Sequence, residues 1–469
     1  SGTRHNVFGI QTGVAISFMV KRARATKDKR PARVYYLRRP ELETAEEKLA
    51  FLASHLMRSL SFDEIQPDKT GHWLNLANND FDSFIPLASK ETKAARTAAK
   101  ERAIFKLYTL GTSTNRDEWV YAESKDAVLA KVHWLMARYE TNLREPSGFD
   151  DSIKWSETLK RNLRAGKSEP IAEQALRLTG YRPFTNRWLY ASSLLVDRPG
   201  NMALIPLHEP SICLSHGKDF RVLGTGCPFD LHFLGDTVGF PFHRLADNTH
   251  YVDNITDWAL KQFTAHYKGA EPSPPPSPSG RGCKTGARKI DKQAIFYYCY
   301  AVLHDPVYRE KYAQNLKREF PRIPFYADFW RWADWGEQLM QLHIGYEAAQ
   351  PFALTRHDEP DLKACAAGMP PKPLLKSDPA AGSIQLDSET TLRGVPPEAW
   401  AYKLGNRSAI DWVLDQHKEK KPKDPTIRER FDTYRFAEHK EKVVDLLHRV
   451  ITVSVETIQI VQAMAAATR

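Results

Sequence analysis

Apolar residues along this chain recur either at three- and four-residue spacing or in short, nearly continuous runs bounded by Gly and Pro. The first pattern predicts amphipathic helices and the second predicts strands. Residues 7–20 are apolar or β-branched at nearly every position, which predicts a strand, or a bent pair of strands, buried on both faces. Residues 34–37 predict a second strand. Because two strands alone cannot bury both faces, we expect a hairpin at the edge of a larger sheet.

Helical periodicity accounts for much of the remaining chain. Thr44 and Glu47 have the spacing of a capping box, and leucines follow them at helical intervals, which predicts a helix over residues 44–60. Ser124 is the expected N-cap of a long helix that ends before Pro146. The other predicted helices cover residues 92–107, 155–164, 251–267, 291–304, 306–320, 326–346, 406–418 and 438–464.

Strands and irregular segments separate these helices. Residues 202–242 hold short strand-like runs between Gly and Pro, which predict a small mixed sheet, and residues 372–392 alternate in the manner of a hairpin. Residues 268–289 are rich in Pro, Ser, Gly and Lys and cannot build a core, so they predict a flexible linker or loop. The whole pattern predicts an α+β fold of small mixed sheets with helices, followed by a mainly helical C-terminal half.

The ten residues from Tyr181 to Tyr190 combine four aromatic residues with two arginines, and Pro183 disfavours helix at Arg182. This predicts a turn that leads into a strand. A rigid turn carrying Arg, Thr and Asn is suited to contacting phosphates and base edges. The alternative is an ordinary strand with a buried aromatic face and solvated arginines.

The composition of the chain indicates what kind of partner it binds and in which compartment it is expected. The net charge of +10 favours an anionic partner, of which nucleic acid is the commonest. Five scattered cysteines argue against a disulfide framework and for a reducing cytoplasm. No signal peptide is visible, and no apolar run reaches the roughly 18 residues that span a bilayer, so we expect a cytoplasmic protein with no membrane partner. The start at Ser1-Gly2-Thr3, without methionine, is consistent with a piece of a longer protein.

Motifs for catalysis or metal binding are weak. Gly166-Lys167-Ser168 lacks the earlier glycine of a phosphate-binding loop, since Arg161 occupies that position. Asp378 to Ser383 has the composition of a hairpin turn. The Cys and His residues between positions 208 and 227 have irregular spacing and no Cys-x-x-Cys pair, so we expect packing residues and no metal site.

Several motifs, in order along nearly the whole chain, resemble the end of the methyltransferase domain and the target recognition region of type ISP single-polypeptide restriction-modification enzymes. Each motif is modestly specific, and the set is strong. The motifs are residues 6–14 (NVFGIQTGV), 114–121 (TNRDEWVY), 181–190 (YRPFTNRWLY), 254–260 (NITDWAL), 303–306 (LHDP) with 308–309 and 315–324 (NLKREFPRIP), 404–409 (LGNRSA) and 450–454 (VITVS).

The resemblance implies a domain organisation. Residues 1–90 would be the tail of the methyltransferase domain, a β-hairpin remnant of a Rossmann-like sheet plus a helix. Residues 91–267 and 290–469 would be two parts of the target recognition domain, joined by the linker at 268–289. The catalytic motifs of such enzymes lie outside this sequence, so we expect no cofactor and no catalysis here. The parent enzyme, an adenine-specific methyltransferase and ATP-dependent endonuclease, would use S-adenosylmethionine, ATP and Mg.

The expected partners are double-stranded DNA and the remaining domains of the parent polypeptide. An adenine methyltransferase flips its target base and needs an aromatic ring to stack on it. Phe8, beside Asn6, matches a position that lines such a pocket, although a core phenylalanine is the stronger alternative. The candidates for close DNA contact are Arg116, Arg182, Asn186 and Arg187, and those for backbone contact are Lys106, Thr114, Asn115 and Thr185.

Two classes of function remain open from the sequence. The first is a sequence-specific DNA recognition module of an ATP-dependent restriction-modification enzyme. The second is a non-catalytic protein-interaction or scaffold module whose basic charge is incidental. For each candidate side chain, the alternative role is a solvated or internally paired group.

Overall fold

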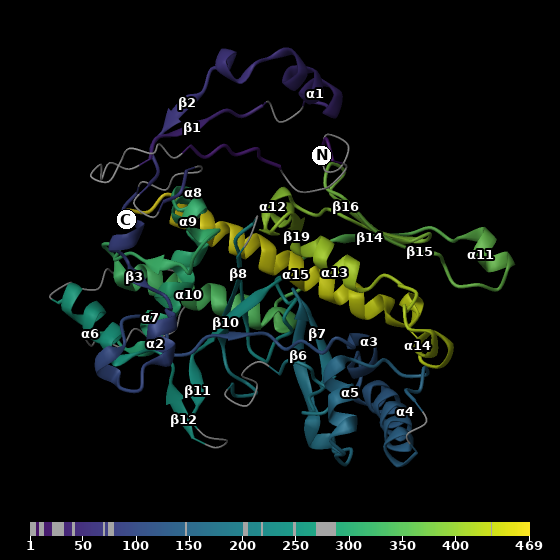
Figure 1. Cartoon of the computed structure of the whole chain (residues 1–469). Coiled ribbons are helices and arrows are strands. Elements are labelled where there is room, and N and C mark those ends of the chain that lie inside the picture. The colour runs from purple at the N-terminus through teal and green to yellow at the C-terminus, as the bar shows by residue number, and fades with distance from the viewer. Residues whose placement is uncertain are drawn as a thin grey trace. The chain divides into compact units, whose positions relative to one another are not determined.

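The computed structural model (Figure 1) describes most of the chain, which divides into two compact units, Ser1–Asn79 and Asp80–Arg469. The described residues are 6–8, 14–20, 32–39, 43–68, 71–73, 79–145, 148–199, 205–216, 219–246, 250–268, 288–432 and 434–469.

The first unit is built on a two-stranded sheet and one helix. β1 (Val34–Tyr36) pairs antiparallel with β2 (Asp63–Ile65). α1 (Ala45–Ser54) starts at the predicted capping box of Thr44 and Glu47, and the 3-10 turn η2 (Met57–Ser59) follows it. The predicted helix is therefore confirmed, but it ends at Ser54.

The predicted hairpin between residues 7–20 and 34–37 is wrong. β1 takes β2 as its partner, and residues 7–8 and 14–20 are not in strands. The described apolar side chains of residues 14–20 are exposed, with Phe18 at 69% and Met19 at 94%, and are not buried in a sheet as the prediction required. Residues 9–13 of the run lie outside the described residues. The β1–β2 pair, the sheet formed by the described residues of this unit, does not by itself confirm a Rossmann-like remnant.

The second unit begins with several short elements. The prediction of one helix over residues 92–107 is therefore wrong. The amides of Ile104 and Phe105 donate to the carbonyls of Pro86 and Leu87 over 2.9 Å each, so the apolar end of the segment enters the core as extended chain. Tertiary pairing overrides the helix propensity of its alanines. The elements are η3 (Phe81–Ser83), β3 (Ile85–Pro86), α2 (Lys90–Ala94), η4 (Ala98–Lys100) and β4 (Thr109–Leu110).

A three-stranded antiparallel sheet with order β5-β7-β6 follows, and α4 packs against it. The helix predicted from Ser124 and the helix predicted over 155–164 are confirmed, and the turn before Thr185 leads into a strand as predicted. The elements are α3 (Asp117–Val120), β5 (Tyr121–Ala122), α4 (Lys125–Arg144), α5 (Glu157–Arg164), η5 (Glu173–Ala175), β6 (Leu176–Arg182) and β7 (Thr185–Tyr190).

A four-stranded sheet with order β4-β10-β8-β9 occupies the middle of this unit. Its strand pairs are all antiparallel, which corrects the predicted mixed sheet. Residues 251–253 pair with β11, so the predicted helix over 251–267 starts only at Asp257. The elements are β8 (Ser211–Ser215), β9 (Arg221–Thr225), β10 (Thr237–Pro241), β11 (His243–Leu245), β12 (Tyr251–Asp253) and α6 (Asp257–His266).

The C-terminal part is mainly helical, as predicted. α7 and α10 pack closely at Gly336, where a Cβ atom would lie 1.8 Å from the carbonyl oxygen of Tyr297. The elements are α7 (Lys292–His304), α8 (Pro306–Lys311), α9 (Ala313–Leu316), β13 (Arg322–Ile323), α10 (Phe329–Ile344) and η7 (Tyr346–Ala348).

The predicted hairpin over residues 372–392 is confirmed and extended to an antiparallel sheet of order β14-β17-β16-β15. The long helix α15 runs from near α14 towards the C-terminus (Figure 1). The elements are β14 (Thr355–Asp358), α11 (Leu362–Ala366), β15 (Pro373–Asp378), β16 (Ser383–Asp387), β17 (Thr390–Arg393), α12 (Pro397–Ala401), β18 (Lys403–Leu404), β19 (Arg407–Ser408), α13 (Ala409–Gln416), α14 (Pro425–Arg430) and α15 (Phe436–Ala465).

The hydrophobic cores of the second unit cross the boundaries drawn from the sequence. One core joins Phe105 and Phe240 to Tyr298 and Trp332, so segments on both sides of the predicted linker share it. Residues 269–287 of that linker lie outside the described residues. The α+β class is confirmed. In the described part of the chain, the search for a helix both long and apolar enough to cross a membrane finds none.

Candidate nucleic-acid interface

The β6–β7 hairpin is anchored at its tip. Phe184, in the two-residue turn, has a φ of 54° and is buried, with its ring 5.4 Å from the ring of Tyr346. Thr185 is also buried, at 8% exposure. The tip therefore packs into the core, and the side of β7 around Asn186 and Arg187 is left half-exposed.

Arg182 is paired inside the protein. Its guanidinium lies 2.8 Å from Asp230, whose side chain is 2% exposed, and it stacks 3.9 Å from the centroid of Tyr181. Burial raises the pKa of Asp230, and the Arg182 charge opposes that shift. Tyr121 also donates to Asp230, over 3.2 Å. These contacts fix the hairpin against the loop that carries Asp230.

Arg187, the basic residue of β7, is somewhat more exposed than Arg182 of β6, at 23% against 17% of the side chain. It forms an ion pair with Glu123 at 3.2 Å and lies 4.7 Å from the centroid of the Tyr181 ring. Its Nε is buried and has no hydrogen-bond partner among the described residues. The neighbouring Asn186 donates to Glu347 over 3.3 Å. Both side chains are held by the carboxylates of exposed glutamates.

The loop before α3 lies beside this hairpin. Asp117 accepts from the hydroxyl of Thr114 and, over 3.3 Å, from the hydroxyl of Tyr181. Asn115 is exposed, has a φ of 54° and donates to Asp197 over 2.9 Å. The structure thus places the two predicted segments, 114–116 and 182–187, around one sheet.

Arg116 is completely buried in the same loop. It lies 3.1 Å from Asp197, and it donates to the hydroxyl of Ser156. Desolvation lowers the pKa of this guanidinium, while the Asp197 charge acts against the shift. Thr114 is buried too, at 1% exposure. In this conformation both side chains hold the loop in place and do not reach its surface.

Lys106 lies apart from these candidates. Its ammonium donates to the carbonyl of Thr92 over 2.8 Å and pairs with Glu101 at 3.2 Å. It therefore closes the turn between α2 and β4. Asn6 and Phe8 belong to the first unit, where the amide of Phe8 donates to Asn6 over 2.8 Å and the ring is 67% exposed.

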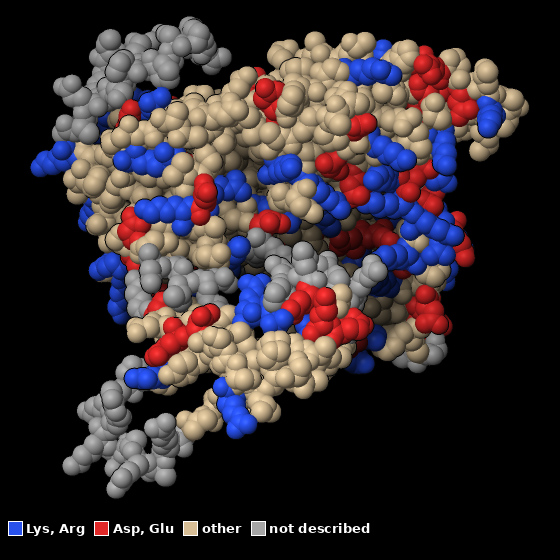
Figure 2. Space-filling model, turned by 90° about the horizontal axis from the view of Figure 1, so that it is seen from above, with Lys and Arg blue, Asp and Glu red and all other residues tan. Residues whose placement is uncertain are grey.

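Sequence reasoning missed the basic segment from Lys418 to Arg435, which follows α13 and contains α14. Four lysines within six residues, Lys418 to Lys423, were the available signal. Figure 2 shows Lys and Arg interspersed with acidic side chains on one face of the molecule, most densely toward the side where Figure 1 has α14.

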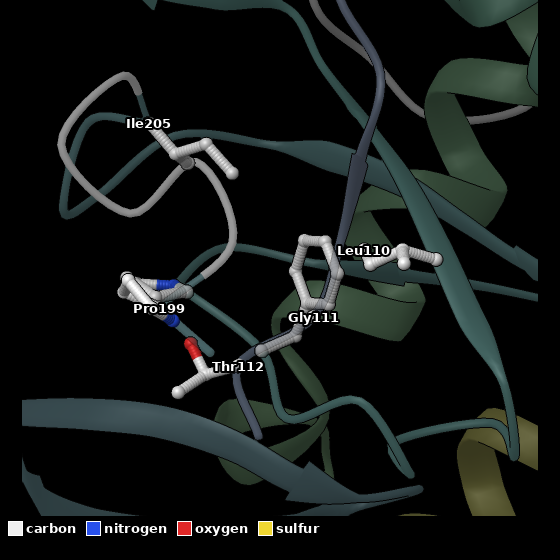
Figure 3. Close-up of a pocket in the computed structure, with 7 residues that line it drawn as sticks. Leu110, Gly111, Thr112, Pro199 and Ile205 are labelled. Carbon is white, nitrogen blue, oxygen red and sulfur yellow. The ribbon is translucent and has the colours of Figure 1, made fainter. Parts of the chain in front are cut away.

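A small pocket lies at residues 110–112 (Figure 3), and its uncharged lining is that of a packing defect and not of a binding site. Leu110, Gly111, Thr112, Pro199 and Ile205 line it with Pro228 and Phe229, and none of these side chains is charged. Gly111 is required there, because a Cβ atom would lie 2.4 Å from the carbonyl oxygen of Asp230. Across the described ranges, no group of three His, Cys, Asp or Glu side chains is arranged to hold a metal ion.

A family comparison identifies this architecture. Residues 103–446 match the model of the Type ISP C-terminal specificity domain. The chain belongs to this family. No curated protein matches the chain. The match includes most of the two predicted parts of the recognition region, 91–267 and 290–469, and both candidate segments, 114–116 and 182–187.

Solved structures of similar proteins extend the likeness to the whole chain. The cryo-EM structure of a DrdV–DNA complex is 41% identical, with a TM-score of 0.85, over 100% of this chain and 47% of that chain. The ATP-dependent Type ISP restriction-modification enzyme LlaBIII, bound to DNA, has 22% identity and a TM-score of 0.68 over 87% of this chain and 26% of its own.

A nuclease-deletion mutant of the Type ISP enzyme LlaGI, in complex with a DNA substrate mimic, has 23% identity and a TM-score of 0.67 over 90% of this chain and 32% of its own. The last two likenesses show a shared fold. This Type ISP specificity domain therefore spans less than half the length of each of the three proteins.

Proposed function

We propose that this chain recognises a sequence in double-stranded DNA on behalf of a Type ISP restriction-modification enzyme. The observation that carries the proposal is its full-length likeness, at 41% identity, to a DrdV chain in complex with DNA. The net charge of +10 is consistent with a polyanionic partner. No particular contact in the described residues favours the alternative of a protein-interaction module.

The proposed base-reading surface consists of Asn115, Asn186 and Arg187. Arg forks bind the O6 and N7 atoms of guanine, and Asn amides bind the N6 and N7 atoms of adenine. Each of the three side chains is held by a carboxylate, of Asp197, Glu347 or Glu123. The other five candidates have supporting roles in this proposal, because burial or internal pairing holds them, namely Lys106, Thr114, Arg116, Arg182 and Thr185.

The parent enzyme is proposed to methylate adenine and to cleave unmodified DNA in the cytoplasm, with S-adenosylmethionine, ATP and Mg as cofactors. LlaBIII, whose described function is ATP-dependent restriction-modification, supports the need for ATP. In this proposal the first unit is the tail of a methyltransferase domain, and Asn6 and Phe8 lie at the pocket for the flipped base. The exposure of the Phe8 ring leaves it available for stacking.

A salt titration of duplex binding tests the proposed function. Each phosphate that the protein neutralises adds about 0.9 to the slope of log affinity against log salt. We expect duplex binding that weakens steeply as salt rises, measured by fluorescence anisotropy of a labelled duplex. Binding that is absent at low salt, or that does not respond to salt, would count against DNA recognition and for the protein-interaction alternative.

A further inference from the structure

The segment between α13 and α14 presents lysines on a loop that is fixed at both ends. We define the lysine loop as residues 418–423, whose four lysines are all exposed. At its C-terminal end, the backbone amides of Lys423 and Asp424 donate to the carboxylate of Glu118 over 3.0 Å each. The loop is thereby attached to α3, which lies about three hundred residues earlier in the chain.

The N-terminal end of the lysine loop is held by the start of α15. Glu419 accepts from the amide of Phe436 over 2.7 Å, at a helix start that has no capping side chain of its own. The hydroxyl of Tyr434 donates to the carbonyl of His417 over 3.2 Å. Two anchors on separate elements reduce the conformational entropy that the loop would lose on binding a partner.

The acidic side chains of this segment accept hydrogen bonds from other parts of the protein, whereas three of its four lysines form no ion pair within the described residues. Glu419 caps α15, and Asp424 accepts from Trp119 and caps α14. Lys420 pairs with Asp415 at 3.0 Å. Lys418, Lys421 and Lys423 form no ion pair with any residue in the described part of the chain. Three of the four exposed lysines of the loop are therefore held by no ion pair in the described part of the chain.

The lysine loop and Arg187 are attached to one short segment of the protein. Glu118 binds the end of the loop, and Glu123, five positions later, binds Arg187. His417 lies close enough to Arg187 for that charge to contribute, after burial, to lowering its pKa to about 4. The geometry consequently fixes the position of the lysines relative to the proposed base-reading strand.

We propose that the lysine loop binds the phosphate backbone of duplex DNA beside the groove that Arg187 and Asn186 read. The inference rests on the proposed function and specifies a surface for it. Phosphate contacts set the register of a protein on DNA and do not depend on sequence. The loop therefore contributes affinity and salt dependence, while β7 contributes discrimination between sequences.

Neutralisation of the loop tests this proposal. The variant K418Q/K420Q/K421Q/K423Q removes four charges. The control K261Q/K268Q/K289Q/K317Q removes four exposed charges at α6, α9 and the start of α7, which Figure 1 places on the side opposite α14. The affinity of the wild type and both variants for a duplex of arbitrary sequence is measured at several salt concentrations. Equal unfolding midpoints of the three proteins establish that the fold is kept.

We expect the loop variant to lose about 0.9 of the salt slope for each phosphate contact removed, and to bind roughly ten- to hundred-fold more weakly at about 0.1 M salt. The control variant should keep most of the wild-type slope. Equal slopes for the two variants, with duplex binding intact in the wild type, would overturn the lysine-loop proposal alone. Failure of the wild type to bind any duplex would overturn the proposed function together with it.

Discussion

The indole nitrogen of Trp119 donates a hydrogen bond to a carboxylate oxygen of Asp424 over 2.8 Å, across 305 positions of the chain. Trp119 is fully buried in the core beside the β5-β7-β6 sheet. Asp424 also accepts from the amide of Ile427 at the start of α14. One carboxylate thus joins α14, the helix after the lysine loop, to α3, which directly precedes β5.

Replacement of Asp424 by alanine should destabilise the protein. The change leaves the buried indole without a partner, at a cost of about 1–3 kcal/mol, and removes an N-cap that contributes about 1 kcal/mol. The free energy of unfolding, measured by urea denaturation, should fall by roughly 2–4 kcal/mol. Glu429→Ala, at an exposed position of α14, is the matched control and should change stability little.

Replacement of Arg182 should lower the free energy of unfolding, and the size of the loss should depend on whether Asp230 keeps its charge. Arg182→Met leaves the carboxylate of Asp230, 2% exposed, without its ion partner, which costs about 3–5 kcal/mol. The double variant R182M/D230N removes the uncompensated charge and should recover much of the loss. If the double variant is as unstable as R182M in urea denaturation, the pair does not act as a buried ion pair.

Arg187→Ala should reduce the preference for the target sequence more than it reduces general DNA affinity. An arginine that binds a guanine edge contributes about 1–3 kcal/mol of discrimination. The ratio of dissociation constants for a preferred and a scrambled duplex should therefore fall by roughly ten-fold or more. The exposed Arg161, on α5, provides the control R161A, which should leave the ratio unchanged. A parallel loss on both duplexes would make Arg187 a phosphate contact.

Acidification should destabilise the fold partly through His417. Burial, with a smaller contribution from Arg187, lowers the pKa of this imidazole to about 4 in the folded protein. Between about pH 6.5 and 4 the unfolded chain binds a proton that the folded protein does not, so stability is lost as the pH falls through this window. His417→Gln should flatten the dependence of unfolding free energy on pH in that range. The exposed His133 on α4 serves as control, and H133Q should leave the slope as it is in the wild type.

Local signals in the sequence predicted the elements that local contacts form. Thr44 with Glu47 and Ser124 cap helices where their sequence patterns placed them. The prediction over residues 92–107 failed because the amides of Ile104 and Phe105 pair with a segment near residue 86. The hairpin predicted between residues 7–20 and 34–37 failed because the strand that pairs with β1 is β2, at Asp63–Ile65, on the far side of α1 in the sequence. Such long-range pairings have no signature in local spacing.

The sequence predicted which segments form the candidate interface, but it did not predict which of their side chains are exposed. The segments 114–116 and 181–190 do meet around one sheet. The burial of Arg116 depends on Asp197, 81 positions away, and that of Arg182 depends on Asp230, 48 positions away. Charge and residue type alone do not separate an arginine that holds a loop from one that faces a partner.

Selection from a pool of duplexes with a randomised central segment tests sequence recognition most directly. The 469-residue chain is incubated with the pool, bound duplexes are recovered and sequenced, and the cycle is repeated at rising salt. Recognition predicts convergence on one motif, with enrichment that weakens when R187A replaces the wild type. Recovery of bound duplexes with no shared motif after repeated cycles would contradict the proposal that this domain reads a DNA sequence.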